Sequence, residues 1–218
     1  MDNIKAVFFD FDNTLGNRHR YSYLAYCAFI DEFLPDLKDD LYIEALRQDM
    51  EIFDEYGNAN LAHVVNSIEK KHGFKINIDN PNSWWIHNLG KYACLYDDTI
   101  DTLEQLNKKY RLGIITNGSS YSQRLKIRNC HIEDYFEHII ISEEVGVKKP
   151  DKGIFLLTCD LFGLKPEECL YVGDTFSNDI YGALNAGMKA VWMWQDDIKE
   201  NSYDVPRLMM LHDLLKIL

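Results

Sequence analysis

The stretch that most constrains the fold is residues 4–15, with the sequence IKAVFFDFDNTL. The range Ile4–Phe9 is almost unbroken in apolar character and rich in branched and aromatic side chains, as in a strand buried on both faces of a parallel sheet. The run ends abruptly in two carboxylates, Asp10 and Asp12, followed by Thr14. Because ligands of open parallel sheets lie at the carboxyl ends of the strands, we expect a site at this tip.

Two carboxylates so close together repel each other and resist ionisation unless a cation lies between them. A ligand set made only of oxygen atoms favours Mg²⁺. The alternative is that Asp10 and Asp12 belong to a solvated loop that follows a core strand and carries no chemistry. The stretch alone is compatible with both interpretations, so the rest of the chain has to separate them.

The composition sets the outer limits. With 218 residues, 46% hydrophobic and 27% charged, the chain can bury a real core as one domain or as a domain that carries a smaller insertion. A net charge of −12 and a pI near 5.0 argue against binding to nucleic acid or to an anionic membrane. We find no signal peptide, no membrane-spanning stretch and no CxxC pair, and therefore expect a cytoplasmic protein in a reducing compartment.

Four helix-like stretches follow the first strand and run to about Cys94. Each places apolar residues on one face at helical spacing, which is most simply explained by helices that pack against one another. Trp84 and Trp85 fit the same explanation better than a stacking role toward a ligand. The apolar positions of the first three stretches are Tyr26, Ile30, Phe33 and Leu34, then Ile43, Leu46, Met50 and Phe53, then Leu61, Val64, Val65 and Ile68.

From Asp97 onward, short apolar runs alternate with helix-like segments. Such alternation predicts a parallel sheet with right-handed crossovers. The predicted strands after the first are 111–116, 138–142, 169–173 and 189–194; the predicted helices are 99–109, one ending near 129, 152–162 and 179–186; an amphipathic segment, 208–218, closes the chain.

The spacing between the first two strands is unusually long. A crossover needs only about a dozen residues, whereas 100 residues (11–110) separate these strands, and the excess is helical in pattern. We therefore expect an α/β fold, with a Rossmann-like doubly wound parallel sheet core formed by residues 1–16 and 96–218. An inserted all-α domain, residues 17–95, would be hinged near Gly16 and Tyr96.

Polar residues follow each of the first four predicted strands. Any one group has a simpler explanation as a turn, a solvated loop or a helix cap. The carboxyl ends of parallel strands lie on one edge of a sheet, however, and acids, a hydroxyl and a cation meeting there are hard to explain by chance. The groups are Asp10, Asp12 and Thr14; Thr116, Asn117 and Gly118; Lys148, Lys149 and Pro150; and Gly173, Asp174 and Thr175 with Asp179.

These groups resemble the four motifs of the haloacid dehalogenase-like hydrolase superfamily, in the right order and on the right strands. The helical insertion resembles the α-helical cap of that family. The resemblance implies a phosphatase that uses Mg²⁺ and passes through an aspartyl-phosphate. The matching segments are DFDNTL at 10–15, TNG at 116–118, KP at 149–150 and GDT at 173–175 with Asp179.

The resemblance also implies a role for each residue. Asp10 would be the nucleophile, and Asp12 would protonate the leaving oxygen and later accept a proton from water. Mg²⁺ would be held by Asp10, the backbone carbonyl of Asp12, and Asp174. Lys149 would neutralise the phosphoryl charge within a cluster of four carboxylates. The remaining roles are phosphoryl binding for Thr116, Asn117 and Gly118, and support of the site for Thr14 and Asp179.

Rival functions are a 2-haloacid dehalogenase or phosphonatase, both disfavoured by the acid at position 12, a phosphomutase, and a non-catalytic binding module. A cap over the site favours a small phosphorylated metabolite, either a nucleoside monophosphate or a sugar phosphate. Arg18 and Arg20, next to His19, are candidates to meet a second anionic group of the substrate, with a solvated helix start as the alternative. The sequence does not indicate an oligomeric state.

Overall fold

The computed structural model describes residues 3–193 and 205–218. Contacts divide the chain into two compact units. Unit 1 comprises Met1–Asn17 and Cys94–Leu218, and unit 2 comprises Arg18–Ala93. The boundaries expected from the sequence, at 17 and 95, lie within two residues of these. In the described part of the chain, none of the helices combines the length and apolar character needed to cross a membrane.

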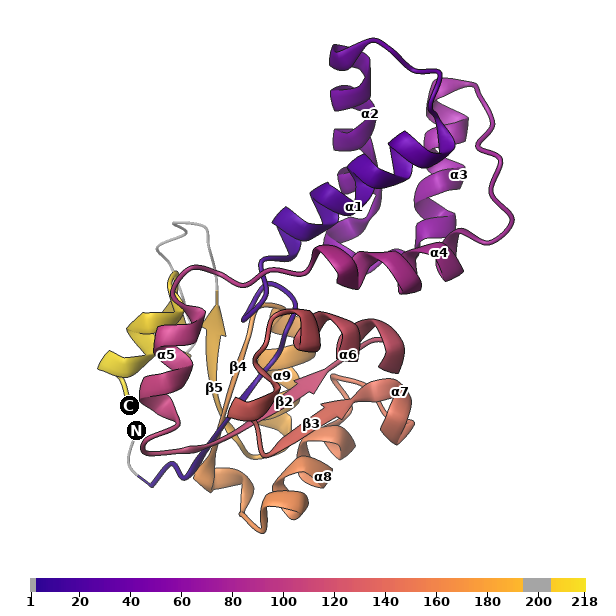
Figure 1. The fold of residues 1–218 in the computed structure, drawn as a ribbon. Coiled ribbons are helices and arrows are strands. Elements are labelled where there is room, and N and C mark those ends of the chain that lie inside the picture. Colours follow the sequence, from indigo (N-terminus) through magenta and orange to yellow (C-terminus); the bar gives the residue numbers. More distant parts are fainter. Residues whose placement is uncertain (1–2, 194–204) are drawn as a thin grey trace. The chain divides into compact units, whose positions relative to one another are not determined.

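Unit 1 contains a six-stranded sheet in the order β3-β2-β1-β4-β5-β6, and every neighbouring pair is parallel (Figure 1). The doubly wound parallel sheet expected from the sequence is therefore confirmed. The short last strand was not predicted, and position 194 of the predicted fifth strand lies outside the described residues. The strands are β1 (Ala6–Phe9), β2 (Arg111–Thr116), β3 (His138–Ile141), β4 (Cys169–Gly173), β5 (Lys189–Met193) and β6 (Arg207–Leu208).

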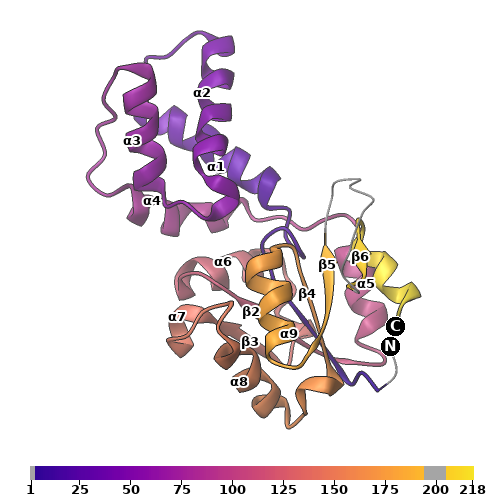
Figure 2. The same cartoon turned by 180° about the vertical axis from the view of Figure 1, so that it is seen from behind.

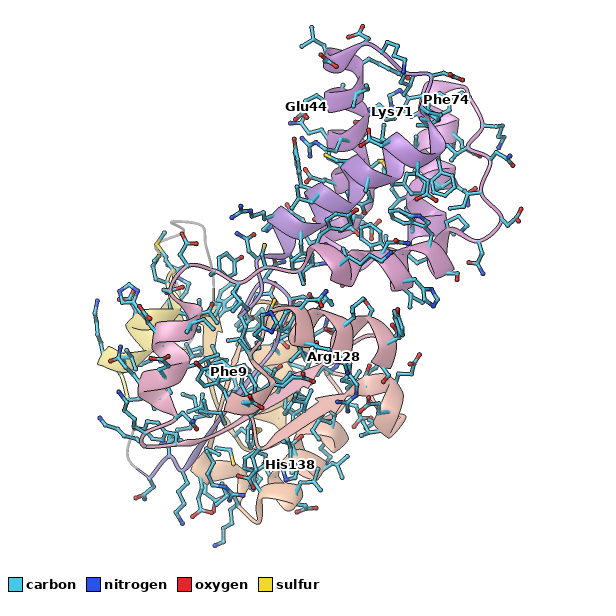
Figure 3. The ribbon with its side chains drawn as sticks, viewed as in Figure 1. Phe9, Glu44, Lys71, Phe74, Arg128 and His138 are labelled. Carbon is cyan, nitrogen blue, oxygen red and sulfur yellow. The ribbon has the colours of Figure 1, made fainter. Side chains whose placement is uncertain are left out.

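Helices cover both faces of this sheet, as Figures 1 and 2 show from opposite sides. Successive side chains of β1 point to opposite faces of the sheet. Phe8 packs edge-on against Phe162 on one face, and Phe9 packs edge-on against Phe136 on the other. Phe9, labelled in Figure 3, is fully buried. One layer has α8 (Lys152–Phe162) and α9 (Tyr181–Asn185); the other has α5 (Thr99–Leu106), α6 (Ser120–Asn129) and the 3₁₀ helix Leu211–Lys216. The short α7 (Ser142–Val145) follows β3 directly.

The order of the strands reverses at β1. The chain leaves β1 toward β2 on one side and leaves β4 toward β5 on the other, although β1 and β4 are hydrogen-bonded neighbours. Beyond the two strands the pairing continues through the Asp10 amide, which donates to the Val172 carbonyl at 2.9 Å. Ligands of doubly wound sheets bind at such a switch point, so the fold favours the tips of β1 and β4 as the location of a site.

Unit 2 is helical and has an apolar core of its own. Trp85 stacks on Tyr26 at 4.8 Å between ring centroids, and Trp84 meets Phe29 edge-on at 5.1 Å, so both tryptophans are partly buried and pack against this core. The four predicted helices are present. They are α1 (Arg18–Phe33), α2 (Asp40–Phe53), α3 (Leu61–His72) and α4 (Pro81–Asn88).

The two segments of unit 1 that lead into and out of unit 2 are paired through their backbones. Gly16 forms an antiparallel bridge with Leu95, and the Asn17 amide donates to the Cys94 carbonyl at 2.9 Å. A further bond joins the Tyr96 amide to the carbonyl of Leu15. The ends of the insertion are thus held side by side.

The packing of α9 on α8 predicts an intolerant position at Gly182. A Cβ there would lie 2.6 Å from Cε2 of Phe155 and 3.1 Å from the backbone Cα of Pro150. Gly182→Ala should therefore lower the free energy of unfolding by about 1–3 kcal/mol, measured by urea denaturation. Asn185→Ala, at an exposed position of the same helix, should change it by less than about 0.5 kcal/mol. Equal effects of the two changes would contradict this account of the packing.

Candidate active site

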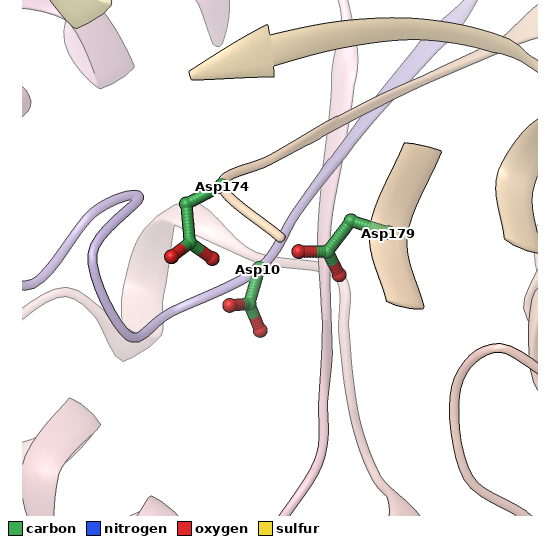
Figure 4. Close-up of side chains that lie close together, drawn as sticks. All are labelled: Asp10, Asp174 and Asp179. Carbon is green, nitrogen blue, oxygen red and sulfur yellow. The ribbon is translucent and has the colours of Figure 1, made fainter. Parts of the chain in front are cut away.

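Three carboxylates meet at the switch point (Figure 4). Asp10 follows β1 directly, and Asp174 follows β4 directly. Asp179 lies six residues beyond the end of β4, in the turn that precedes α9. One oxygen of each carboxylate lies within 4.8 Å of the others. Asp10 and Asp179 are buried and Asp174 is partly exposed. Strand ends separated by more than 160 residues of sequence are thus brought to one point (174 − 10 = 164).

Lys149 lies among these carboxylates and is itself buried. Its Nζ donates to Oδ1 of Asp10 at 2.7 Å, to Oδ1 of Asp179 at 2.6 Å and to the hydroxyl of Tyr171 at 2.8 Å. The Tyr171 hydroxyl in turn lies 2.9 Å from the carbonyl of Ile115, which accepts from it. Three acceptors therefore satisfy the three donors of the ammonium, and burial of the charge is compensated.

Asp179 owes its place to a π turn and a glycine. The turn spans Phe176–Ile180, and the amide of Thr175 donates to Oδ2 of Asp179 at 2.9 Å. A Cβ at Gly173 would lie 2.5 Å from the carboxyl carbon of Asp179. Only glycine at the end of β4 therefore leaves room for this carboxylate, while its two oxygens are bonded to Lys149 and to the turn.

The end of β2 is tied to the lysine loop. The side chain of Asn117 donates to the carbonyl of Lys149 at 3.0 Å and accepts from its amide at 2.9 Å. Thr116 is buried at the strand end, and the exposed Gly118 donates its amide to the Ser142 hydroxyl at 3.0 Å. The resemblance implied phosphoryl binding for Asn117; its side chain has the additional role of fixing the backbone that carries Lys149.

Asp12 is held apart from the other acids by a second lysine. Lys126 Nζ lies 2.7 and 2.6 Å from the two carboxylate oxygens of Asp12, and Gln123 Nε2 donates to Oδ2 at 3.0 Å. The expectation of four carboxylates around one lysine therefore needs correction: three surround Lys149, and the fourth pairs with Lys126.

The other predicted residues lie in different surroundings. Thr14 is fully buried, and its Oγ1 has no hydrogen-bond partner among the described residues. Arg18, in unit 2, is buried and donates through both terminal nitrogens to Asp54, at 2.5 and 3.1 Å. Arg20 is exposed. The guanidinium of Arg18 is thus paired with a carboxylate of unit 2, an arrangement that differs from both alternatives expected from the sequence, a contact with a second anionic group and a solvated helix start.

The charges of the cluster shift the protonation of its members. Burial, with contributions from Asp179 and Asp12, raises the pKa of Asp10 from 3.8 to about 6, although Lys149 opposes the shift. Burial, together with the negative charges of Asp10 and Asp179, raises the pKa of Asp174 well above its ordinary value. Burial acts to lower the pKa of Lys149, but Asp10 and Asp179 outweigh it and hold the pKa above its ordinary value. The cluster lacks positive charge.

The three acids fit a divalent cation. Mg²⁺ binds oxygen at about 2.0–2.1 Å, so opposed ligands of one ion lie about 4 Å apart, close to the span of the carboxylate oxygens here. Burial and the neighbouring acids raise the pKa values of Asp10 and Asp174, and a bound cation would supply the positive charge that favours their ionised forms. Asp179 already accepts from Lys149 and Thr175, which leaves Asp10 and Asp174 as the better ligands.

Three residues of the site escaped sequence reasoning. Lys126 and Gln123 belong to a helix whose polar sequence predicts an exposed surface helix. Their spacing of three nevertheless places them on one face. Tyr171 belongs to an apolar strand and reads as core. The position of α6 directly after the TNG segment was the one signal that could have pointed to Gln123 and Lys126.

Comparison with known proteins agrees with this geometry. Residues 4–187 match the family model of the haloacid dehalogenase-like hydrolases, and the chain belongs to this family. The glyceraldehyde 3-phosphate phosphatase of Pyrococcus abyssi is 36% identical over 202 residues, covering 87% of this chain and 81% of the relative.

Two further similarities concern a mammalian enzyme and a solved structure. The N-acylneuraminate-9-phosphatase of Mus musculus is 32% identical over 210 residues, covering 88% of this chain and 84% of the relative. The crystal structure of the HAD-hydrolase YfnB from Bacillus subtilis, bound to magnesium, has the same fold, with a TM-score of 0.78, 24% identity and 99% coverage of both chains.

The surplus of negative charge predicts that Asp10→Asn stabilises the metal-free protein. The pKa of Asp10 in the folded state, about 6, lies above its ordinary value of 3.8, so the charged form weakens the fold and this cost grows as the pH rises from about 4 to about 6. In chelator, Asp10→Asn should raise the free energy of unfolding by about 1–3 kcal/mol at pH 8 and by little at pH 4. Urea denaturation at both pH values measures it.

Asp160→Asn, at an exposed position of α8, is the matched control and should show no such dependence on pH. Added Mg²⁺ should stabilise the wild type more than Asp10→Asn, because the variant has lost a ligand. A variant that is less stable than the wild type at pH 8 in chelator would show that repulsion in the cluster is not the dominant force.

Proposed function

We propose that this hydrolase is a Mg²⁺-dependent phosphatase of small phosphorylated metabolites, with sugar phosphates as the leading class. The observation that supports it best is the division of labour at the tip of β1. Asp10 is bound to Lys149 beside two further acids, while Asp12, two residues away, has a separate pair of donors. One carboxylate is therefore available for attack and the other for proton transfer. The enzyme is a phosphoric monoester hydrolase, as the named functions of its relatives support.

Mg²⁺ would be held by Asp10, Asp174 and the backbone carbonyl of Asp12. Asp179 would hold Lys149 in place and act as a supporting residue. When bound, the ion supplies positive charge that offsets repulsion between the acids and the phosphoryl oxygens. Lys149, fixed by three acceptors, adds a second positive charge on the same side of Asp10.

In the first step, a carboxylate oxygen of Asp10 attacks phosphorus while the bond from phosphorus to the leaving oxygen breaks. Asp12 gives its proton to that oxygen, so the alcohol departs neutral. In the second step, water attacks the aspartyl-phosphate and loses a proton to Asp12, which releases phosphate and restores Asp10. Thr116 and the amide of Asn117 would bind the phosphoryl oxygens throughout, and the amide of Gly118 would join them on releasing its bond to the Ser142 hydroxyl.

The substrate class is supported by the relatives and by a pocket within unit 2. The pocket has a volume of about 400 Å³, and it contains the buried pair of Arg18 and Asp54 together with Glu51. One positive and two negative side chains leave no surplus for a second phosphate. We therefore propose that an uncharged, hydroxylated part of a substrate binds there. The other lining residues are His19, Ser22, Gln48, Ile52 and Tyr56.

The turn that follows α2 supports this assignment. Glu55, Tyr56 and Gly57 all have positive φ, at 50°, 57° and 92°, and a Cβ at Gly57 would lie 2.8 Å from Cζ of Arg18. Two non-glycine residues in the left-handed region cost free energy, which a purely connecting turn does not require. Unit 2 would serve as the cap of the enzyme, and the protein would act in the cytoplasm.

A screen of phosphorylated metabolites tests the proposed function. With Mg²⁺ present, sugar monophosphates should be hydrolysed with higher kcat/KM than nucleoside monophosphates or bisphosphorylated sugars, because the pocket in unit 2 has no free positive charge. Excess EDTA should abolish turnover and Mg²⁺ should restore it. Full activity in EDTA, or release of halide from 2-haloacids, would favour the dehalogenase instead, and transfer of phosphate between two sugars would favour a phosphomutase.

Asp12→Asn should separate the two steps. A sugar phosphate has a poor leaving group, so its first step should slow by about 10²–10⁴-fold without the acid. Nitrophenolate is a good leaving group that needs no proton. With nitrophenyl phosphate, Asp12→Asn should therefore show a burst of nitrophenolate and then slow turnover, with phosphate retained on Asp10. Rapid quench and intact-mass measurement detect that adduct. Asp10→Asn should give neither burst nor adduct; equal slowing of both substrates by Asp12→Asn would remove its acid–base role.

A further inference from the structure

Lys126 is a buried cation that the proposed reaction does not use. It is 2% exposed, and its Nζ contacts both oxygens of the Asp12 carboxylate, at 2.7 and 2.6 Å. Taking an ammonium out of water costs several kcal/mol unless a well-placed partner compensates. The same Nζ lies 5.6 Å from the ring centroid of Phe11, the residue before Asp12. Lys126 therefore packs against the segment that carries Asp12 and is shielded from solvent.

Gln123 lies one turn earlier on α6 and completes the contact. Its Nε2 donates to Oδ2 of Asp12 at 3.0 Å and to the carbonyl of Asn117 at 2.8 Å, and the residue is 3% exposed. A Cβ at Gly118 would lie 2.8 Å from that same Nε2, and the φ of Gly118 is 143°. The glycine after Asn117 thus leaves the space that the amide of Gln123 occupies.

Asp12 needs such support because it lies in a turn beyond the end of β1. The next residue, Asn13, has a positive φ of 59°, and the backbone of Asp12 forms an isolated bridge with Gly16 within this turn, which leaves the orientation of the side chain to its own contacts. Transfer of a proton requires an approach of about 2.6–3.2 Å to the leaving oxygen, and an error of about 1 Å can cost 10²-fold in rate. A carboxylate with both oxygens bonded by Lys126 and Gln123 has one orientation.

We propose that Lys126 and Gln123 are positioning residues for Asp12, which fix its carboxylate for the acid and base steps. The proposal rests on the proposed function, in which Asp12 transfers the proton. Neither residue needs to contact the substrate. Their contribution to the rate of the first step should then parallel that of Asp12. It should be large for substrates whose leaving group needs a proton and small for substrates whose leaving group does not. A purely structural role would instead affect every substrate alike.

Lys126→Met tests this role in the full-length, Mg²⁺-loaded protein. For a sugar phosphate, kcat should fall about 10–100-fold while KM changes less than about 3-fold. For nitrophenyl phosphate, the rate of the initial burst should stay within about 3-fold of the wild type, followed by slower turnover, because hydrolysis of the aspartyl-phosphate still needs Asp12. Lys126→Arg, which keeps two donors and the charge, should recover part of the lost rate.

Gln123→Met keeps the charge and should show the same split between substrates at smaller size. Arg128→Met is the matched control, since Arg128 lies on the same helix (Figure 3), has a side chain 67% exposed and pairs weakly with Glu133 at 3.9 Å. It should leave both rates unchanged. Thermal unfolding of each variant establishes that the fold is intact; if Lys126→Met does not fold, Gln123→Met and Lys126→Arg carry the test.

Three results would overturn the proposal. They are equal losses in the aryl burst and the alkyl turnover, unchanged rates in both Lys126→Met and Gln123→Met, and a rise in KM that accounts for the whole loss. Absence of phosphatase activity in the wild type is a different failure, because it would remove the proposed function itself before any variant is compared.

Discussion

The ion pair of Lys149 with Asp10 is the interaction on which the arrangement of the site depends. Its ammonium is bonded to Asp10 and Asp179 and to the hydroxyl of Tyr171, so one buried cation joins the tip of β1 to the turn after β4. Burying a single unpaired charge would cost several kcal/mol, and here the hydrogen bonds and opposite charges of the neighbouring groups compensate that cost. The remaining excess of negative charge is what makes the cluster a cation site and not merely a salt bridge in the core.

Two glycines make this concentration of polar and charged groups possible. Glycine at 173 gives the carboxylate of Asp179 the room it occupies, and glycine at 118 does the same for the amide of Gln123. The parallel sheet adds the directional element, because all its carboxyl ends face one edge and the strand order reverses there. The site therefore depends both on its carboxylates and on the glycines that leave room for neighbouring side chains.

Much of this was predictable because it is local in sequence. Apolar runs gave five strands, helical stripes gave the core of unit 2, and polar residues at strand ends indicated the acids and Lys149. The parts that could not be predicted depend on contacts between distant residues. Lys126 lies in a polar helix and is buried only because Asp12 folds against it, 114 residues away in sequence. Arg18 is neutralised by Asp54 across 36 residues, and β6 is a two-residue strand that exists through its pairing with β5.

The paired connectors at Gly16 and Leu95 have a consequence for how the chain folds. Joining β1 to β2 means closing a loop that contains all of unit 2, 76 residues from 18 to 93. Loop-closure entropy grows with the length of flexible chain, but unit 2 has its own apolar core and can order first. Once unit 2 has folded, its two ends lie next to each other, so the connection between β1 and β2 behaves as a short loop when these strands pair. The same geometry makes the insertion exchangeable during evolution: a different helical unit with adjacent ends could replace it without altering the register of a single strand.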